Sequence, residues 1–198
     1  MLTLLSPAKK LNMIPVETGV PITKPRLRKD TRELAGVAKA QSAKNLKRLM
    51  HISDNLANMN FERFQAFNLD NRSNSAKAAG LAFDGDVYWG LEADSLSDEA
   101  LAYAQDHLRI LSGLYGVLRP MDAIQPYRLE MGTKLANGRG KSLYEFWGAR
   151  IADRLKADLA GHADKTVVNL ASNEYFKAVD SKALGKRVIG AKFLNVKD

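Results

Sequence analysis

The sequence predicts an α/β domain in which helices surround a mixed β-sheet. Apolar runs typical of buried strands lie at residues 1–5 and 166–170. Between them, apolar residues recur at spacings of three and four, the period of amphipathic helices. The length of 198 residues suits one domain. Because we find no repeat, low-complexity tract or linker, we expect residues 1–198 to form a single domain.

The first third of the chain is expected to contain one strand and three helices. The strand covers Met1–Leu5 and ends at Ser6-Pro7, because proline cannot continue a β-ladder. A loop with three prolines follows over 12–30, and 68–75 forms a polar loop. Each helix is expected to start at a polar N-cap residue, namely Thr31, Ser42 and Ser53.

The remaining elements are predicted from local punctuation and periodicity. Residues 83–90 are rich in turn formers, and Ser97 caps a strong helix. Residues 108–112 either extend that helix or form a short strand. Further elements are expected as a helix over 143–159 and strands over 166–170 and 187–196.

The composition excludes several classes of site. The chain has no cysteine, which excludes disulfides, zinc ribbons, thiol nucleophiles and cysteine-bound iron–sulfur clusters. The absence of cysteine fits a cytoplasmic protein. No apolar run approaches the roughly 20 residues of a membrane span, and the N-terminus does not resemble a signal peptide. We therefore expect no membrane contact.

The sequence indicates no metal site and no cofactor. His51, His107 and His162 lie in separate segments without metal-ligand spacing. Asp84-Gly-Asp86 could ligate Mg²⁺, although this pattern is more typical of a solvated turn. Trp89 and Trp147 each precede a glycine and are expected in the core.

Charge is strongly segregated along the chain, whose net charge is +8. Residues 1–50 carry 11 Lys and Arg against 3 Asp and Glu, whereas residues 51–106 carry 3 against 10. Residues 107–198 are basic again, with 16 against 9. Because phosphates are attracted to basic surfaces, this pattern favours one side that faces a polyanion such as nucleic acid. A basic protein without such a partner is the alternative.

Three apolar runs end in the same way, with a serine, a turn and then a lysine or tyrosine. In an open α/β sheet, ligands bind outside the carboxyl ends of the strands. If the three runs are neighbouring strands, they bring hydroxyl and ammonium groups to one cleft suited to a phosphate. Otherwise the serines are ordinary turn residues. The polar groups are Ser6, Lys9, Ser112, Tyr115, Ser172, Tyr175 and Lys177.

The segment Gly113-Leu-Tyr-Gly116 supports two mechanisms besides a plain turn. In the first, helices on either side make a helix-hairpin-helix-like element near 97–120, whose glycines let backbone N–H groups approach a DNA phosphate. In the second, the glycines cradle the phosphate of an enzyme's substrate. Arg119 and Arg128 follow beside Asp122 and Glu130, where they either contact phosphate or hold the loop together.

Motifs along almost the whole chain resemble the YaaA family of bacterial peroxide-stress proteins. These motifs are Leu4–Lys9, Phe83–Tyr88, Gly90–Leu91, His107–Pro120, Asp122, Gln125–Gly132, Leu143–Tyr144, Phe146–Gly148, Asn169–Ser172, Glu174–Tyr175 and Lys177. The resemblance implies a further basic, aromatic segment after Val196, which this chain lacks. It also implies threonine at position 10, where this chain has Lys10.

The resemblance further implies a single domain of unusual fold with a basic cleft and a helix-hairpin-helix-like element. It implies binding of duplex DNA with little sequence preference and a role in limiting iron-dependent DNA damage by peroxide. The sequence does not indicate a protein partner. The DNA-binding or anion-binding residues expected on this basis are Ser6, Lys9, Lys10, Ser112, Gly113, Tyr115, Gly116, Arg119, Arg128, Ser172, Tyr175 and Lys177.

Two other hypotheses remain open. The first is an enzyme that acts on a nucleotide or a phosphorylated small substrate in the same cleft. Its site residues would be Ser6, Lys9, Tyr115, Glu174, Tyr175 and Lys177. The second is an iron-related or regulatory interaction protein without a catalytic site. We favour the DNA-binding protein, which requires no catalytic residue.

Overall fold

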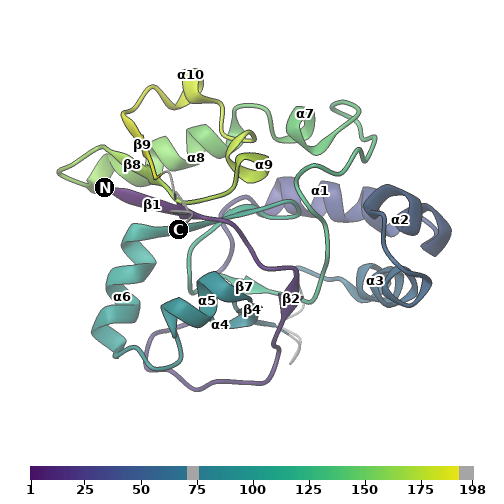
Figure 1. Ribbon diagram of the computed structural model, residues 1–198, viewed down its shortest axis with the longest axis horizontal. Coiled ribbons are helices and arrows are strands. Elements are labelled where there is room, and N and C mark those ends of the chain that lie inside the picture. Colours follow the sequence, from purple (N-terminus) through teal and green to yellow (C-terminus); the bar gives the residue numbers. More distant parts are fainter. Residues whose placement is uncertain (71–75, 192–198) are drawn as a thin grey trace, which may run out of the picture.

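A five-stranded sheet forms the centre of the computed structural model, which describes residues 1–70 and 76–191 (Figure 1). The strand order is β6-β5-β1-β8-β9. The strands are β1 (Leu2–Leu5), β5 (Leu108–Ser112), β6 (Gly116–Leu118), β8 (Val167–Asn169) and β9 (Val188–Gly190). Four strands run parallel, and β6 is antiparallel to β5. The predicted mixed α/β fold is therefore confirmed.

The central strand β1 carries leucines on both faces. Leu2 and Leu4 are fully buried and Leu5 is nearly so. This pattern is typical of a central strand in a parallel sheet that is covered on both sides. Figure 1 shows α8 (Arg150–Asp158) above the sheet and α6 (Asp98–His107) below it. The strand expected over 187–196 is confirmed at β9, and residues 192–198 lie outside the described part.

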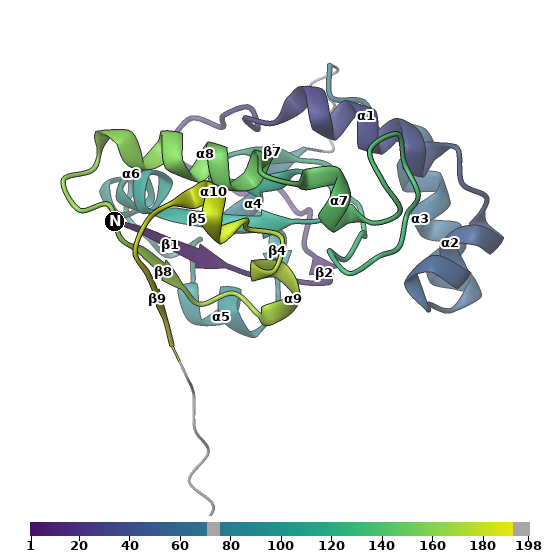
Figure 2. The ribbon, with the colours of Figure 1, turned by 90° about the horizontal axis from the view of Figure 1, so that it is seen from above.

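Three helices form a unit at one end of the molecule (Figure 2). They are α1 (Arg28–Lys39), α2 (Ala43–Met50) and α3 (Asp54–Ala66). Ser42 and Ser53 cap α2 and α3 as predicted, since their side-chain oxygens accept hydrogen bonds from backbone N–H groups in the first turn of each helix. The prediction that Thr31 caps α1 is wrong. Thr31 lies inside that helix, where its hydroxyl donates to the Leu27 carbonyl oxygen at 2.9 Å.

The helix expected over 143–159 is divided in two. It consists of α7 (Leu143–Trp147) and α8, followed by a short 3₁₀ turn at Leu159–Gly161. The break is at Gly148, which ends α7 with a φ of +47°. Glycine adopts this conformation at little cost, so it ends the helix although the apolar pattern continues.

The helix-hairpin-helix-like layout near 97–120 is not formed. Ser97 caps α6 as predicted, but the helix ends at His107 and residues 108–112 are strand β5. The residues after the turn form β6, which pairs with β5 from Ile110↔Leu118 to Ser112↔Gly116. The segment is therefore one helix followed by a β-hairpin, because its apolar run completes the sheet.

Smaller elements complete the fold. Two short antiparallel ladders join β2 (Lys10–Leu11) to β4 (Phe83–Asp84) and β3 (Lys77–Ala78) to β7 (Ala123–Ile124). The remaining helices are α4 (Ala79–Ala82), α5 (Asp86–Leu91), α9 (Asn173–Phe176) and α10 (Ser181–Leu184). The polar loop expected over 68–75 falls partly on residues 71–75, outside the described part. None of the helices in 1–70 and 76–191 is long and apolar enough to cross a membrane.

Candidate functional site

The three strands that are followed by a serine are neighbours, so the first of the two alternatives for these runs holds. Strand β1 lies between β5 and β8 and is parallel to both, so their carboxyl ends share one edge of the sheet. Ser6 Oγ accepts a hydrogen bond from the Ser172 backbone N–H at 2.9 Å, and it lies 3.3 Å from Ser172 Oγ. These contacts fix the loops that follow β1 and β8 against each other.

A small hollow, which we call the strand-end site, opens beside these strand ends. Lys9, Arg128, Glu130 and Tyr175 line it together with Tyr127. Arg128 Nε donates to Glu130 Oε1 at 2.8 Å, while Glu130 Oε2 is buried and has no hydrogen-bond partner among the described residues. The hollow has a volume of about 20 Å³, room for roughly one water molecule. In this conformation it admits a small polar group only.

The tyrosines of this hollow are neutral hydrogen-bonding groups. Burial raises the pKa of Tyr175 and of Tyr127 above the usual range, and nearby Glu130 raises both further. The Tyr127 hydroxyl shares a 2.6 Å hydrogen bond with Ser112 Oγ. A phenol with a raised pKa does not act as a base near neutral pH. These rings can therefore position a ligand but cannot take a proton from it.

The β5–β6 hairpin lies below this site rather than on the surface. Ser112 and Tyr115 are fully buried, and Gly113 and Gly116 are buried with them. Trp147 Nε1 donates to the Gly113 carbonyl oxygen at 3.0 Å, so this turn packs against a tryptophan. The expectation that these residues contact a phosphate is not met in this conformation.

Arg119 is not part of the strand-end site. It follows β6, which runs antiparallel to β5, so it lies toward the opposite edge of the sheet. Its guanidinium pairs with the fully buried Asp122 at 2.7 Å and donates to the Lys24 carbonyl oxygen at 3.2 Å. The loop-holding alternative therefore describes Arg119.

Lys9, Lys10 and Lys177 are exposed. Lys10 pairs with Asp84 at 2.7 Å, and Lys177 Nζ lies 5.1 Å from the centre of the Tyr144 ring. Within the described part of the chain, Lys9 makes no ion pair. Of these lysines, it is the cation most available to a ligand.

A basic helical hairpin lies elsewhere, at α2 and α3, where sequence reasoning did not place a site. His51 has a φ of +53° and ends α2, and Ser53 then caps α3. Lys44, Arg48 and His51 follow at spacings of four and three, which places them on one exposed face. Their spacing was visible in the sequence and could have indicated this face. A hollow of about 810 Å³ adjoins it.

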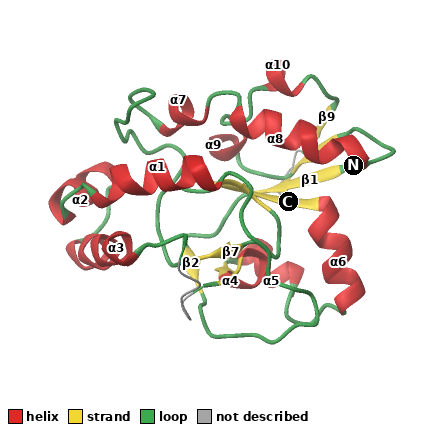
Figure 3. Ribbon diagram, turned by 180° about the vertical axis from the view of Figure 1, so that it is seen from behind, coloured by secondary structure: helices red, strands yellow, loops and turns green. Residues whose placement is uncertain are grey.

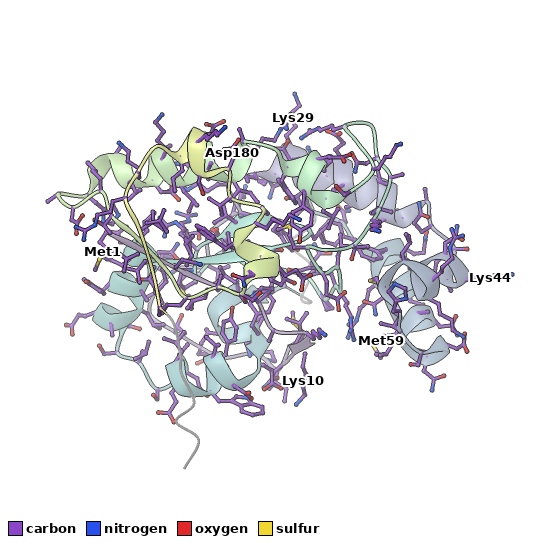
Figure 4. All side chains as sticks on the ribbon, turned by 45° about the horizontal axis from the view of Figure 1, so that its top comes forward. Met1, Lys10, Lys29, Lys44, Met59 and Asp180 are labelled. Atoms are coloured by element: carbon purple, nitrogen blue, oxygen red, sulfur yellow. The ribbon has the colours of Figure 1, made fainter. Side chains whose placement is uncertain are left out.

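Figures 3 and 4 show how this hairpin is presented. In Figure 3, α2 and α3 lie beside each other at the edge of the molecule, away from α6. In Figure 4, Lys44 extends outward from α2. Neither Lys44 nor Arg48 forms an ion pair with the residues that the structure describes. Lys47 pairs with Asp54 at 2.8 Å, so its charge is neutralised across the turn.

Comparison with known proteins identifies the family. The family model described as peroxide stress protein YaaA matches residues 1–198. A UPF0246 protein of Phenylobacterium zucineum is 54% identical over 198 residues, which is all of this chain and 74% of that protein. A UPF0246 protein of Caulobacter vibrioides is 55% identical over 98% of this chain and 75% of its own length. The chain belongs to the YaaA family.

This assignment confirms the family resemblance and makes the chain a peroxide stress protein of the YaaA family. A further relative, from Saccharophagus degradans, is 52% identical over the whole chain and 77% of its own length. Much of the long motif from His107 to Gly132 is buried, in the β5–β6 hairpin and the loop after it. In this YaaA-family chain the motif supplies residues 127–130 to the lining of the strand-end site.

The structure corrects the expectation for one tryptophan. Trp147 is fully buried as predicted, but Trp89 is 60% exposed. Adjacent residues of a helix are about 100° apart, so burial of Tyr88 turns Trp89 toward solvent. The glycine that follows each tryptophan gave no indication of which ring is buried and which is exposed.

Among residues 1–70 and 76–191, no group of three or more His, Asp or Glu side chains is placed to hold a metal ion.

Proposed function

We propose that this chain binds duplex DNA through its phosphates, with little sequence preference, and so limits iron-dependent DNA damage during peroxide stress. The observation that carries the proposal is the basic face of α2, where Lys44, Arg48 and His51 are exposed along one side of the helix, from its first turn to the turn before α3. Membership of a peroxide stress family supports the biological setting.

Two basic side chains of α2 without ion-pair partners among the described residues favour this proposal over a structural role for the helix. Lys44 and Arg48 have no carboxylate partner in 1–70 and 76–191, so a phosphate would not have to displace an existing ion pair. The release of condensed counterions from DNA then drives binding. The net charge of +8 acts in the same direction by attracting polyanions from a distance.

The geometry of the hairpin fits phosphate contact. The capped N-terminus of α3 lies at the turn between the helices, where free backbone N–H groups and the helix dipole favour an anion. The Asp54 carboxylate repels an anion at this position, but its negative charge is balanced by the ion pair with Lys47. We assign the hollow that Lys44, Arg48 and His51 line to the basic cleft that the resemblance implies.

Fluorescence anisotropy with unrelated duplexes at several salt concentrations tests the binding. We expect the logarithm of the affinity to fall linearly with that of the salt concentration, with similar values for each sequence. A large preference for one duplex would contradict the proposal. The protective role is tested by counting strand breaks in plasmid DNA exposed to ferrous iron and peroxide. We expect fewer breaks with this protein than with an equal concentration of albumin.

The enzyme hypothesis is retained because of one observation. Glu130 Oε2 is buried without a partner beside Arg128 and the exposed Lys9, at the edge where α/β proteins bind substrates. A nucleotide or phosphorylated substrate would place its phosphate on Lys9. This alternative predicts that Lys9→Ala abolishes turnover in a nucleotide and phosphosugar screen while duplex affinity is unchanged. If no substrate is turned over, the hypothesis fails.

A further inference from the structure

An exposed tryptophan is held in a fixed position on α5. The Trp89 side chain donates a hydrogen bond from Nε1 to Asp84 Oδ1 at 2.6 Å, and Lys10 Nζ lies 2.7 Å from Asp84 Oδ2. These two hydrogen bonds lower the pKa of the Asp84 carboxyl group, so that it stays ionised. The 60% exposure of Trp89 therefore does not reflect a freely rotating ring.

A hollow of about 130 Å³ lies next to this ring. Phe83 and Tyr88 form part of its wall, with ring centres 5.3 Å apart. The polar residues Asn12, Lys77 and Asp94 also line it, together with Val16, Gly80, Leu81 and Ala93. Aromatic surface and hydrogen-bonding groups are thus combined in one place.

Lys77 is an unusual member of this lining, because it is a buried cation with 6% of its surface exposed. Its Nζ donates to the Asn12 carbonyl oxygen at 3.1 Å and makes no other hydrogen bond within the described residues. Burial lowers the pKa of Lys77, although Asp94 and Asp84 oppose this effect. The ammonium group has three N–H donors, so two remain for a ligand.

We propose that this hollow binds an unpaired nucleobase, with Trp89 stacked on the base and Lys77 and Asp94 hydrogen-bonded to its edge. Extruded bases are bound in this manner, by stacking on aromatic side chains and by hydrogen bonds to their edges. Lys10 is exposed, and its Nζ pairs with the same Asp84 carboxylate that holds the Trp89 ring, so the attached phosphates would lie near Lys10. An apolar partner fits less well, because it would leave the two remaining Lys77 donors unpaired and would offer the Asp94 carboxylate no hydrogen bond.

The base could come from DNA with an unpaired position or from a free nucleotide. The first source rests on the proposed DNA binding, and the second does not. For DNA, the proposal adds a substrate class, namely duplexes that contain an unpaired base. The hollow lies apart from the basic hairpin in sequence, so the two contacts can be tested separately.

Tryptophan fluorescence provides a direct measurement, because Trp147 is fully buried and Trp89 is exposed. Wild-type protein is titrated with a paired duplex, with the same duplex carrying one bulged adenine, and with adenosine monophosphate. We expect the bulged duplex to quench the emission more than the paired duplex does. We also expect about tenfold tighter binding of the bulged duplex by anisotropy, the effect of one stacked base.

Two variants complete the test. Trp89→Ala should bind both duplexes equally, whereas Tyr103→Ala should keep the preference, because Tyr103 is an exposed aromatic residue that stacks on His107 in another region. Urea unfolding checks that each variant folds. The quenching measured with the wild-type protein tests the site even if a variant fails to fold.

The possible outcomes separate the two proposals. Equal affinity and equal quenching for both duplexes would overturn the nucleobase site and leave DNA binding intact. If neither duplex binds but adenosine monophosphate quenches the emission, DNA binding fails and the site holds with a free nucleotide. If none of the three ligands quenches the emission, the nucleobase site is overturned.

Discussion

The indole N–H of Trp147 donates a hydrogen bond to the carbonyl oxygen of Gly113, 3.0 Å away and 34 residues earlier in the chain. This contact joins α7 to the turn between β5 and β6. The same turn leaves no space for side chains, because a Cβ on Gly113 would lie 2.1 Å from the Leu129 carbonyl oxygen. A Cβ on Gly116, whose φ is +71°, would lie 2.8 Å from the Trp147 ring. The glycines of this hairpin are therefore required for packing.

Gly113→Ala is expected to reduce the free energy of unfolding by about 3 kcal/mol, because the new methyl group must displace backbone rather than a flexible side chain. Urea denaturation measures the change. Gly138→Ala is the matched control, since a Cβ there meets no atom within 4 Å. If both variants are as stable as the wild type, the packing role of Gly113 is wrong.

A buried ion pair links β5 to α8. Arg109 Nε donates to Asp158 Oδ2 at 2.7 Å, and their side chains are only 4% and 3% exposed. Asp158→Ala leaves the Arg109 cation buried without its partner, so we expect a loss of about 3–5 kcal/mol in the free energy of unfolding. Asp54→Ala removes an exposed pair with Lys47 and should change it by less than about 1 kcal/mol. Equal losses in the two variants would contradict this difference.

The pH dependence of stability should include a contribution from His162. Burial, then the N-terminal ammonium and His107, lower the pKa of His162, and its Nδ1 lies 3.1 Å from that ammonium. Because the folded-state pKa is below the unfolded value of about 6.5, this contribution is complete above that pH and is lost as pH falls through the folded-state pKa. Thermal unfolding from about pH 7.5 to about pH 5 should show a smaller drop in Tm for His162→Gln than for the wild type. An identical drop would exclude this contribution.

The strand-end site could be predicted because its signals are local. An apolar run followed by serine marks the ends of β1, β5 and β8, and the parallel sheet then brings Ser6 and Ser172 together. The sequence could not decide between helix and strand at 108–112, because a five-residue segment with three apolar residues suits both. That choice depends on pairing with β1, a contact between segments far apart in the chain.

The placement of individual cations could not be predicted for a similar reason. Arg119 and Lys44 are both basic residues in basic segments, yet Arg119 is neutralised by the buried Asp122 and Lys44 is exposed on α2. Segment charge is a property of the sequence, whereas ion pairing depends on which carboxylate the fold brings close. For Trp89 too, the direction of the ring followed from burial of its neighbour Tyr88.

The most direct test of the central claim is the duplex affinity of the Lys44→Ala/Arg48→Ala double variant. Its matched control is Lys156→Ala/Lys182→Ala, which removes the same charge from exposed positions on α8 and α10, away from α2 (Figure 1). We predict that the first variant binds at least about tenfold more weakly and that its salt slope falls by about 2, while the control stays close to the wild type. Equal affinity in the two variants would contradict DNA binding through the face of α2.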